Sequence, residues 1–515
     1  MCGILVCYGK PLPRLDFLTL LEKLDHRGPD KLVYTYGSNT QFGFCRLAIN
    51  GTTTNISDQP FDNDTHTLVC NGEVFNYESL AIANELDSVF SSDCEVILPL
   101  MRKYPFNVVC DKMDAEFAMV IHDKKNDRLL VARDRYGVRP LFVARSADDS
   151  RICFASEAKA LIHSDLCEVR QVTPGVCSLY RYVEGKVYLE SEVTYNQELD
   201  IPNVISDSYE SVRNSVRTLL CEAVGKRILM TDRPACCLLS GGLDSSLVSA
   251  LAAKTYDRFG KTLHTFSIGL KGSPDLAAAK KVSDHIKSHH TSVEVSEDDF
   301  INAIPDVISS IESYDTTTVR ASVGNYLIAK YIAENTDFKV ILNGDYADEV
   351  CGGYLYINKA PTRYDFHMEC KRLLKDIHYY DSLRSDRTIC AHGLEARAPF
   401  ADKAFVSYYL SLSTNVSSPL DKCEKWLLRD AFSDSGILPD EILWRKKEAF
   451  SDGVSDVKRS WHSIIKEKFG DEDAYYKDIF IKNFGEERLN LIPYKWLPKF
   501  CGDVTDPSAR ELTFY

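Results

Sequence analysis

The chain lacks the features that mark several large classes of protein. None of its apolar stretches reaches the roughly 18 residues that a membrane-spanning helix needs. Its first residues, MCGILVCYG, contain no basic segment followed by an apolar stretch of the kind found in signal peptides. It has no run of lysine and arginine, and its formal net charge is -14. A nucleic-acid backbone or an anionic membrane is therefore not expected as its main partner.

The 17 cysteines also lack the spacing of a metal site or a disulfide framework. No two of them form a CxxC pair and their number is odd, whereas zinc ligands usually come in closely spaced pairs. Cysteines inside apolar runs, such as Cys70, Cys153, Cys236 and Cys237, are expected to be buried free thiols. We therefore expect a protein of a reducing, cytoplasmic compartment.

Composition and length predict a globular protein with more than one domain. Hydrophobic residues make up 44% and charged residues 26% of the 515 residues, and domains usually hold about 100–200 residues each. The polar stretch Asn196–Asp207 has neither strand nor helix periodicity. We predict an amino-terminal domain over residues 1–195, a linker over 196–210 and a second domain over 211–515.

The two halves differ in the rhythm of their expected secondary structure. Helices are expected near Leu15–Leu24 and Asp93–Tyr104. The rest of the first half carries short β-branched and aromatic runs that predict stacked antiparallel sheets, an α+β sandwich: CGILVCYG, TLVCNGEVF, FAMVIHD, RLLVARD, PLFVARS, RICFAS and VCSLYRYV. In the second half, strand-like and helix-like segments alternate, as in ACCLLS followed by SSLVSALAAKTY, which predicts an α/β doubly wound parallel sheet. From about Tyr364 the chain is expected to be mostly helical.

Cys2 is a candidate nucleophile because of its position in the chain. Removal of Met1 would leave a free α-amino group beside the Cys2 thiol. An α-amine titrates near pH ~8, so its neutral fraction at neutral pH can accept the thiol proton, directly or through water. A sequence that begins Met-Cys does not by itself identify such chemistry, so the role of Cys2 is judged from other residues of the first half.

Other residues of the first half can bind an amino-acid substrate and support hydrolysis of an amide. The guanidinium of Arg46 can bind the substrate carboxylate as a bidentate fork. Glu73 and Asp93 can bind its ammonium group. Asn71 and the Gly72 backbone N–H can form an oxyanion hole, in which each donor stabilises the transition state by about 3–4 kcal/mol.

The motifs MCGI, HRGPD, NGEVFNY and RDRYGVRPLF together resemble the class II glutamine amidotransferase domain. The resemblance implies an N-terminal-nucleophile fold, with stacked sheets between helix layers, and the roles just assigned. Taken singly, Arg46 also fits a surface charge and Asp93 a helix cap. The occurrence of four motifs in one half of the chain favours the amidotransferase interpretation.

The segment SGGLDSS, Ser240–Ser246, is a candidate phosphate loop. It follows an apolar strand and precedes a helical stretch, where backbone N–H groups and a helix dipole converge. It lacks the lysine of a Walker A loop, and the GKT at Gly260–Thr262 lacks the earlier glycine. The loop resembles that of ATP pyrophosphatases, which attach AMP to a carboxylate, and Asp244 is then a candidate Mg²⁺ ligand. The alternative is an ordinary glycine-rich turn.

Further segments resemble the glutamine-hydrolysing asparagine synthetase family over nearly the whole chain: YDTTTVRAS, DEVCGGYLYINKAP, GLEARAPFADK, RKKEAFSDGV, WLPKF and TDPSAR. The resemblance implies an ATP site made of Leu238, Ser240, Gly241, Gly242, Asp244, Ser245, Ile268 and Gly344. It implies an aspartate site made of Thr316, Thr317, Arg320, Asp345, Asp348 and Glu349. Asp244 and Asp348 would hold Mg²⁺, and Lys447 would lie on the departing phosphates.

One segment departs from the family pattern. Where the family has Ser-Gly-Glu-Gly-Ser-Asp-Glu, residues Asn343–Glu349 read NGDYADE. Asp345 keeps the carboxylate that would act as base toward ammonia, one methylene shorter, while Tyr346 replaces a flexible glycine. Asn343 and Ala347 remove two hydroxyl groups. Activation of aspartate is therefore the less secure half of the expected reaction.

The sequence predicts ATP-dependent synthesis of L-asparagine from L-aspartate. Cys2 would release ammonia from L-glutamine through a thioester, and the ammonia would attack a β-aspartyl adenylate, giving asparagine, AMP and pyrophosphate. Mg²⁺ is the expected cofactor, and the resemblance implies a homodimer. Two alternatives stay open: an amidotransferase of the same architecture acting on a different carboxylate, and a non-catalytic regulatory homologue that lost turnover through the changes at Asn343–Ala347.

Overall fold

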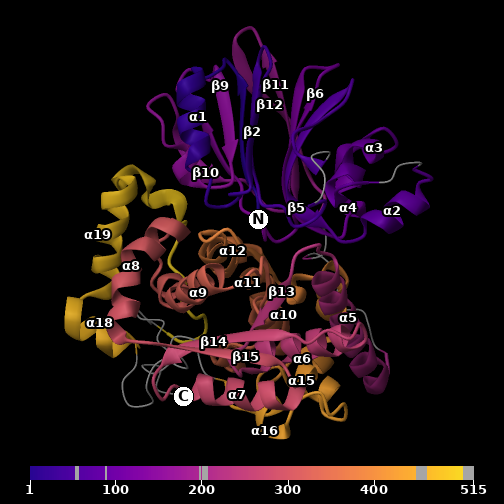
Figure 1. Ribbon diagram of the computed structural model, residues 1–515, viewed down its shortest axis with the longest axis vertical. Helices are drawn as coiled ribbons and strands as arrows, with labels where there is room; N and C mark the ends of the chain where they lie inside the picture. The colour runs from indigo at the N-terminus through magenta and orange to yellow at the C-terminus, as the bar shows by residue number, and fades with distance from the viewer. Residues whose placement is uncertain are drawn as a thin grey trace. The chain divides into compact units, whose positions relative to one another are not determined.

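The computed structural model describes residues 1–52, 57–86, 90–196, 199, 207–420, 422–447 and 461–502. The chain forms two compact units (Figure 1). The first unit comprises Met1–Gln197, Cys390–Glu395 and Phe484–Leu491, and the second comprises the remainder. Most of the predicted linker 196–210, the TDPSAR segment and the part of RKKEAFSDGV after Lys447 lie outside the described residues.

Two antiparallel sheets form the first unit. The first sheet has the order β10 (Cys167–Gln171), β8 (Phe142–Arg145), β9 (Arg151–Ala155), β1 (Gly3–Gly9), β3 (Thr40–Arg46) and β2 (Lys31–Tyr36). The second has the order β12 (Lys186–Thr194), β11 (Val176–Val183), β7 (Arg128–Arg133), β6 (Ala115–Asp123), β5 (His66–Val74) and β4 (Phe61–Asp62).

The two sheets face each other across a shared core. Ile4, Val6 and Tyr8 alternate along β1 and pack in one buried cluster with Val69 of β5 and Val120 of β6. The outer faces are covered by α1 (Arg14–Glu22) on one side and by α2 (Tyr77–Ala83), α3 (Ile97–Met101) and α4 (Phe106–Lys112) on the other (Figure 1). Because both faces of its sheet are covered, β1 is buried along its whole length. The predicted α+β sandwich is confirmed.

The strand-like runs read from the sequence all form strands, and the helix expected near Leu15–Leu24 is α1. The helix expected over Asp93–Tyr104 begins as a 3-10 turn at Asp93–Val96 and continues as α3. The sequence did not predict α2, nor the strands β2, β3, β10 and β12. In β2 and β12 most side chains are exposed, so polar residues interrupt the apolar alternation that identifies a strand.

The prediction that Cys153 is a free thiol is wrong, because Cys153 forms a disulfide with Cys7. The two residues lie directly opposite each other in the register of β1 and β9, with their Cα atoms 4.2 Å apart. Their sequence separation of 146 residues hides this pairing from any local pattern. The other cysteines, including Cys70, Cys236 and Cys237, are free.

The second unit is built on a five-stranded sheet with the order β15 (His289–Val295), β14 (His264–Leu270), β13 (Ala235–Leu238), β16 (Val340–Leu342) and β17 (Glu395–Arg397). The pairs β15 with β14, β14 with β13, and β13 with β16 are parallel. Counted along the chain the order is 3-2-1-4-5, the arrangement of a doubly wound sheet. The order reverses between β13 and β16, and ligands of such sheets bind at the carboxyl ends of the strands at this reversal.

Helices lie on both sides of this sheet (Figure 1). The predicted α/β doubly wound fold is confirmed, as is the mostly helical character beyond Tyr364. No helix among the described residues is long and apolar enough to cross a membrane. The helices are α5 (Tyr209–Leu229), α6 (Leu243–Asp257), α7 (Pro274–Ile286), α8 (Glu297–Ile311), α9 (Thr316–Asn335), α10 (Ala347–Cys351), α11 (Arg363–Asp376), α12 (Asp381–Cys390), α13 (Lys403–Ser411), α14 (Thr414–Ser417), α15 (Trp426–Phe432), α16 (Asp440–Leu443), α18 (Trp461–Phe469) and α19 (Glu472–Phe484).

Candidate active sites

Cys2 lies immediately before β1 and is largely enclosed. Its thiol donates to the carbonyl oxygen of Leu47 over 3.7 Å, and its backbone nitrogen donates to Asn71 Oδ1 over 2.9 Å. Burial raises the pKa of the Cys2 thiol to about 11, so the thiol is protonated at neutral pH and needs a base. While Met1 is present, the backbone nitrogen of Cys2 is an amide nitrogen. Removal of Met1 would turn this nitrogen into the amine that is expected to act as the base.

Asn71 has the geometry of an oxyanion-hole donor. Its Oδ1 accepts the hydrogen bond from Cys2, so its Nδ2 points elsewhere, and that buried nitrogen has no hydrogen-bond partner among the described residues. A buried polar group left without a partner costs about 1–3 kcal/mol, a cost that a substrate oxyanion would remove. The neighbouring Gly72 permits close packing, because a Cβ there would lie 2.5 Å from the carbonyl oxygen of Glu116.

The two carboxylates predicted for the substrate ammonium converge. Asn50 Nδ2 donates to Glu73 Oε2 over 2.7 Å and lies 3.5 Å from Asp93 Oδ1. The other oxygen of Asp93 accepts from the backbone N–H of Val74 over 2.7 Å. The N-cap position of the turn Asp93–Val96 is occupied by Ser92, so Asp93 is not the helix cap that the sequence also allowed. Sequence reasoning missed Asn50, which lies outside the four motifs.

Arg46, at the end of β3, is buried rather than a surface charge. Its guanidinium donates to Asp58 Oδ1 over 2.5 Å and to the carbonyl oxygens of Gly51 and Asn50 over 3.0 and 3.2 Å. Only 8% of the residue is exposed. The segment that binds Arg46 therefore also presents Asn50, the residue that connects the two predicted ammonium ligands. The ion pair with Asp58 was not predicted.

Arg27 belongs to the HRGPD motif, whose residues were assigned no individual roles from the sequence. It is fully buried, and its Nε donates to the carbonyl oxygen of Cys2 over 3.0 Å. Its Nη1 pairs with Glu157 Oε1 at 2.9 Å. Arg27 thus connects the backbone of the candidate nucleophile to a buried carboxylate.

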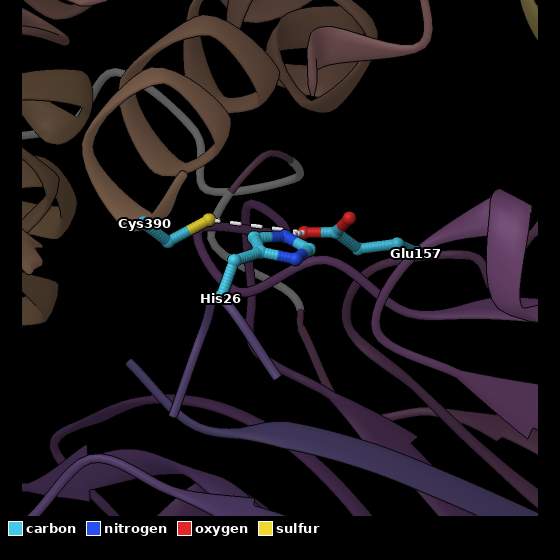
Figure 2. Close-up of side chains that lie close together, drawn as sticks. All are labelled: His26, Glu157 and Cys390. Carbon is cyan, nitrogen blue, oxygen red and sulfur yellow. Dashed lines mark hydrogen bonds and ion pairs between the residues drawn. The ribbon is translucent and has the colours of Figure 1, made fainter. Parts of the chain in front are cut away.

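Figure 2 shows that the side chains of His26 and Cys390 lie close to the Glu157 carboxylate. Glu157 Oε1 lies 3.1 Å from His26 Nε2 and 3.8 Å from Cys390 Sγ. This combination of donors is one that zinc accepts. However, Glu157 already pairs with Arg27 and, at 2.7 Å, with Lys159, so its charge is balanced without a metal ion. The cluster fixes Arg27.

A cavity of about 290 Å³ opens in the second unit at the reversal point between β13 and β16. Its walls include six of the eight predicted ATP residues: Leu238, Ser240, Gly242, Asp244, Ser245 and Gly344. The other two do not line it. Ile268 is buried in β14, and Gly241 has a φ of +76° where a Cβ would lie 2.5 Å from that of Ala278. Gly241 therefore supports the turn and does not face the cavity.

The SGGLDSS loop is tied together by its own hydroxyl groups. Ser240 Oγ lies 2.9 Å from Ser245 Oγ and accepts from the Gly242 N–H over 3.3 Å. The loop leads directly into α6, whose 15 residues give its N-terminus a partial positive charge. Gly344 packs against this terminus, since a Cβ there would lie 2.7 Å from the Ser245 nitrogen. The arrangement suits a phosphate group.

Asp244 and Asp348, the predicted Mg²⁺ ligands, face each other across Lys425. The Lys425 ammonium lies 2.5 Å from an oxygen of each carboxylate, and Lys447 lies 2.6 Å from Asp348. These ammonium groups hold the pKa of Asp348 well below its usual range, although burial alone would raise it. Asp244 Oδ1 is buried without a partner among the described residues. Two carboxylates with a spare oxygen fit a hard cation such as Mg²⁺. Lys425 was not predicted.

The predicted aspartate residues of α9 are only partly brought to the cavity. Thr317 and Arg320 line it, and Thr317 Oγ1 is buried without a partner among the described residues. Thr316 is not a lining residue and lies 3.4 Å from Asp473. The guanidinium of Arg320 makes a bidentate ion pair with Glu472, at 2.9 and 2.5 Å.

Asp345 and Glu349 line the cavity within a buried network of charge. Asp345 Oδ1 accepts from Arg384 over 2.7 Å, whereas its buried Oδ2 has no hydrogen-bond partner in the described part of the chain. Arg384 also pairs with Asp381 at 2.8 Å, and Tyr354 donates to Glu349 over 2.5 Å. Burial raises the pKa values of both Asp345 and Glu349. Arg384, Asp381 and Tyr354 were not assigned from the sequence.

Both halves of the chain are similar to known proteins. The glutamine amidotransferase domain model matches residues 1–201, and the asparagine synthase family model matches residues 215–369 and 358–489. A probable glutamine-hydrolysing asparagine synthetase of Acanthamoeba polyphaga mimivirus is 40% identical over 559 residues, covering 99% of this chain and 100% of its own. The human glutamine-hydrolysing asparagine synthetase is 40% identical over 564 residues, covering 100% of this chain and 99% of its own. The Gallus gallus enzyme is 39% identical over 560 residues, with the same coverage.

Proposed function

We propose that this chain, which belongs to the asparagine synthase family, synthesises L-asparagine from L-aspartate with ATP and with ammonia released from L-glutamine. The observation that carries the proposal is the presence of two candidate sites in one chain. One is Cys2 with the unpartnered Nδ2 of Asn71 beside it. The other is the cavity at the reversal point of a doubly wound sheet, lined by the SGGLDSS loop and paired carboxylates.

In the amidotransferase half, the amine of mature Cys2 accepts the thiol proton, and the sulfur attacks the side-chain amide carbon of glutamine. Asn71 Nδ2 and the Gly72 N–H stabilise the oxyanion of the tetrahedral intermediate. Ammonia leaves, and water hydrolyses the thioester to glutamate. Arg46 binds the α-carboxylate of glutamine, and Glu73 with Asp93 binds its ammonium group.

In the synthetase half, the loop at Ser240–Ser246 and the α6 N-terminus bind the phosphates of ATP. Bound Mg²⁺, held by Asp244 and Asp348, would neutralise phosphate charge. The β-carboxylate of aspartate attacks the α-phosphate and displaces pyrophosphate, whose negative charge Lys447 stabilises. Ammonia then attacks the β-aspartyl adenylate, Asp345 accepts a proton, and AMP leaves.

We also assign the protein to a reducing, cytoplasmic compartment, because most of its cysteines are free thiols. A homodimer is proposed from the family resemblance alone. Analytical ultracentrifugation at several protein concentrations tests the dimer, which a single monomeric species would contradict.

The choice of carboxylate is tested by measuring pyrophosphate release from MgATP with L-aspartate, D-aspartate, L-glutamate or succinate, each with glutamine present. We expect L-aspartate alone to give pyrophosphate, AMP and asparagine in equal amounts. Release with another carboxylate and none with L-aspartate would identify a different amidotransferase. Tight nucleotide binding without release from any carboxylate would identify a regulatory homologue.

A further inference from the structure

The segment that departs from the family pattern is fastened to α12 at three successive points. Asn343 Nδ2 donates to Ser385 Oγ over 2.7 Å. Arg384 Nη2 donates to Asp345 Oδ1 over 2.7 Å. The Tyr346 hydroxyl group hydrogen-bonds to that of Ser382.

Two of these contacts fall on one face of α12, because Ser382 and Ser385 are three residues apart and are therefore neighbours on the helix surface. Arg384 starts from a different side of the helix and reaches Asp345 with its long side chain. Asn343 also accepts from the backbone N–H of Asp345, over 3.3 Å. The turn after β16 is therefore held by a hydrogen bond within the turn and by its contacts with α12.

Tyr346 adopts a backbone conformation that disfavours a side chain. Its φ is +75°, the left-handed region that glycine tolerates, and a non-glycine residue there costs about 1–3 kcal/mol. Its ring is nonetheless buried, with 1% of the residue exposed, and its hydroxyl group has a partner in Ser382. Strain of this kind persists only where surrounding contacts fix it.

The residue placed by this turn is Asp345. It precedes Tyr346, lines the cavity, and presents there a carboxylate whose Oδ2 has no partner in the described part of the chain. A base one methylene shorter than glutamate has less reach, so its position depends more on the backbone that carries it. Proton transfer requires hydrogen-bond distance between base and substrate.

We propose that Tyr346 is a positioning residue: its hydrogen bond to Ser382 fixes the left-handed turn that directs the Asp345 carboxylate into the cavity, where it accepts a proton from the attacking ammonia. The inference rests on the proposed function and deepens it. Tyr346 acts through Asp345 and acts on ammonia transfer, whereas formation of the adenylate does not require it.

The test uses the full-length protein with ammonia as nitrogen donor and compares Tyr346→Phe, Ser382→Ala, the double variant and Ser382→Thr. Tyr364→Phe is the control, because Tyr364 is a tyrosine of the same unit that is 65% exposed. Aspartate-dependent exchange of pyrophosphate into ATP measures adenylation, and asparagine formation measures ammonia transfer.

We expect Tyr346→Phe and Ser382→Ala each to lower asparagine formation about tenfold or more, since misplacing a reacting group by about 1 Å costs a hundredfold. Exchange of pyrophosphate should stay within about twofold of wild type. The double variant should lose no more than either single variant, because both remove one shared interaction. Ser382→Thr, which keeps the hydroxyl group, should retain most activity.

The melting temperature of each variant is measured as well, because a loss of asparagine formation without a loss of stability separates positioning from folding. Asparagine formation at the wild-type level in Tyr346→Phe would overturn the inference while leaving the proposed function intact. A wild-type protein that forms no asparagine would overturn both.

Discussion

Arg27 donates a hydrogen bond through Nε to the carbonyl oxygen of Cys2, over 3.0 Å. The guanidinium is itself fixed by Glu157, in a cluster that also contains His26 and Cys390 (Figure 2). Because the contact reaches the backbone of the proposed nucleophile, we expect the ion pair to hold the Cys2 sulfur in place relative to Asn71.

Replacing Glu157 by glutamine should therefore impair the amidotransferase half selectively. Removing one partner of a buried ion pair typically costs about 3–5 kcal/mol of folding stability, so the melting temperature is measured alongside activity. We expect glutamine hydrolysis to fall about tenfold, as for a small misplacement of a reacting group, with ammonia-dependent synthesis unchanged. Asp165→Asn, which removes a largely exposed partner of Arg151, is the control. Equal loss of both activities would contradict a role specific to Cys2.

Asn71 and Asn50 should respond differently to truncation. Asn71→Ala removes the unpartnered buried donor, and loss of one oxyanion-hole donor lowers kcat by about 10²–10³. Asn50→Ala instead removes the amide that bridges Glu73 and Asp93. This variant should raise the KM for glutamine with a smaller effect on kcat. Steady-state glutaminase kinetics on both variants check this. A change confined to KM in Asn71→Ala would exclude the oxyanion role.

The pH dependence of ammonia-dependent synthesis should report on Asp345. Burial raises the pKa of its carboxyl group, and a base must be ionised, so the rate should fall as the pH drops through that raised pKa. The Arg384 guanidinium lowers the same pKa. Arg384→Gln should therefore shift the acidic limb of the rate profile to higher pH.

The profile is recorded at a constant concentration of unprotonated ammonia, so that titration of ammonium does not contribute. Arg384→Lys retains a positive charge and should shift the limb less than Arg384→Gln. An acidic limb that stays in place or moves to lower pH in Arg384→Gln would show that Asp345 is not the titrating base.

Lys425 should act as a counter-ion of the proposed Mg²⁺ ligands Asp244 and Asp348. Its ammonium is buried between Asp244 and Asp348, so Lys425→Met leaves the two carboxylates close together with Lys447 as their remaining cation. We expect a loss of about 3–5 kcal/mol of stability. Millimolar Mg²⁺ should raise the melting temperature of this variant more than that of wild type, because the ion binds only the folded carboxylate pair.

Lys281→Met is the matched control, since Lys281 pairs with Glu441 on the surface, and exposed ion pairs contribute about 0–1 kcal/mol. The same response to Mg²⁺ in wild type and Lys425→Met would show that the two carboxylates do not bind the ion.

Much of the fold and the amidotransferase site could be predicted because the signals are local. Cys2, Asn71 and Glu73 occur in short motifs. The alternation of strands and helices predicts a doubly wound sheet, and the cavity opens where its 3-2-1-4-5 strand order reverses. Partners supplied from distant segments could not be predicted. Lys425 reaches Asp244 and Asp348 from a segment with no recognisable motif. The Cys7–Cys153 disulfide depends on a strand register set by the whole sheet.

Tyr346 illustrates the limit most clearly. From the sequence it replaces a flexible glycine and indicates impaired chemistry, since nothing near it in the chain compensates. In the structure its hydroxyl group hydrogen-bonds to Ser382 on α12, a residue 36 positions away along the chain that no local pattern places beside it. The segment Asn343–Glu349, which departs from the family pattern, is thus held in place by specific contacts with α12.

In the proposed reaction Cys2 serves only the release of ammonia, while the second half of the chain makes asparagine. The most direct measurement is asparagine and AMP formation by wild type and Cys2→Ala, with glutamine or with ammonia as nitrogen donor. We predict that Cys2→Ala abolishes glutamine-dependent synthesis and leaves ammonia-dependent synthesis at the wild-type rate. Equal loss of both activities in Cys2→Ala would contradict this division of labour.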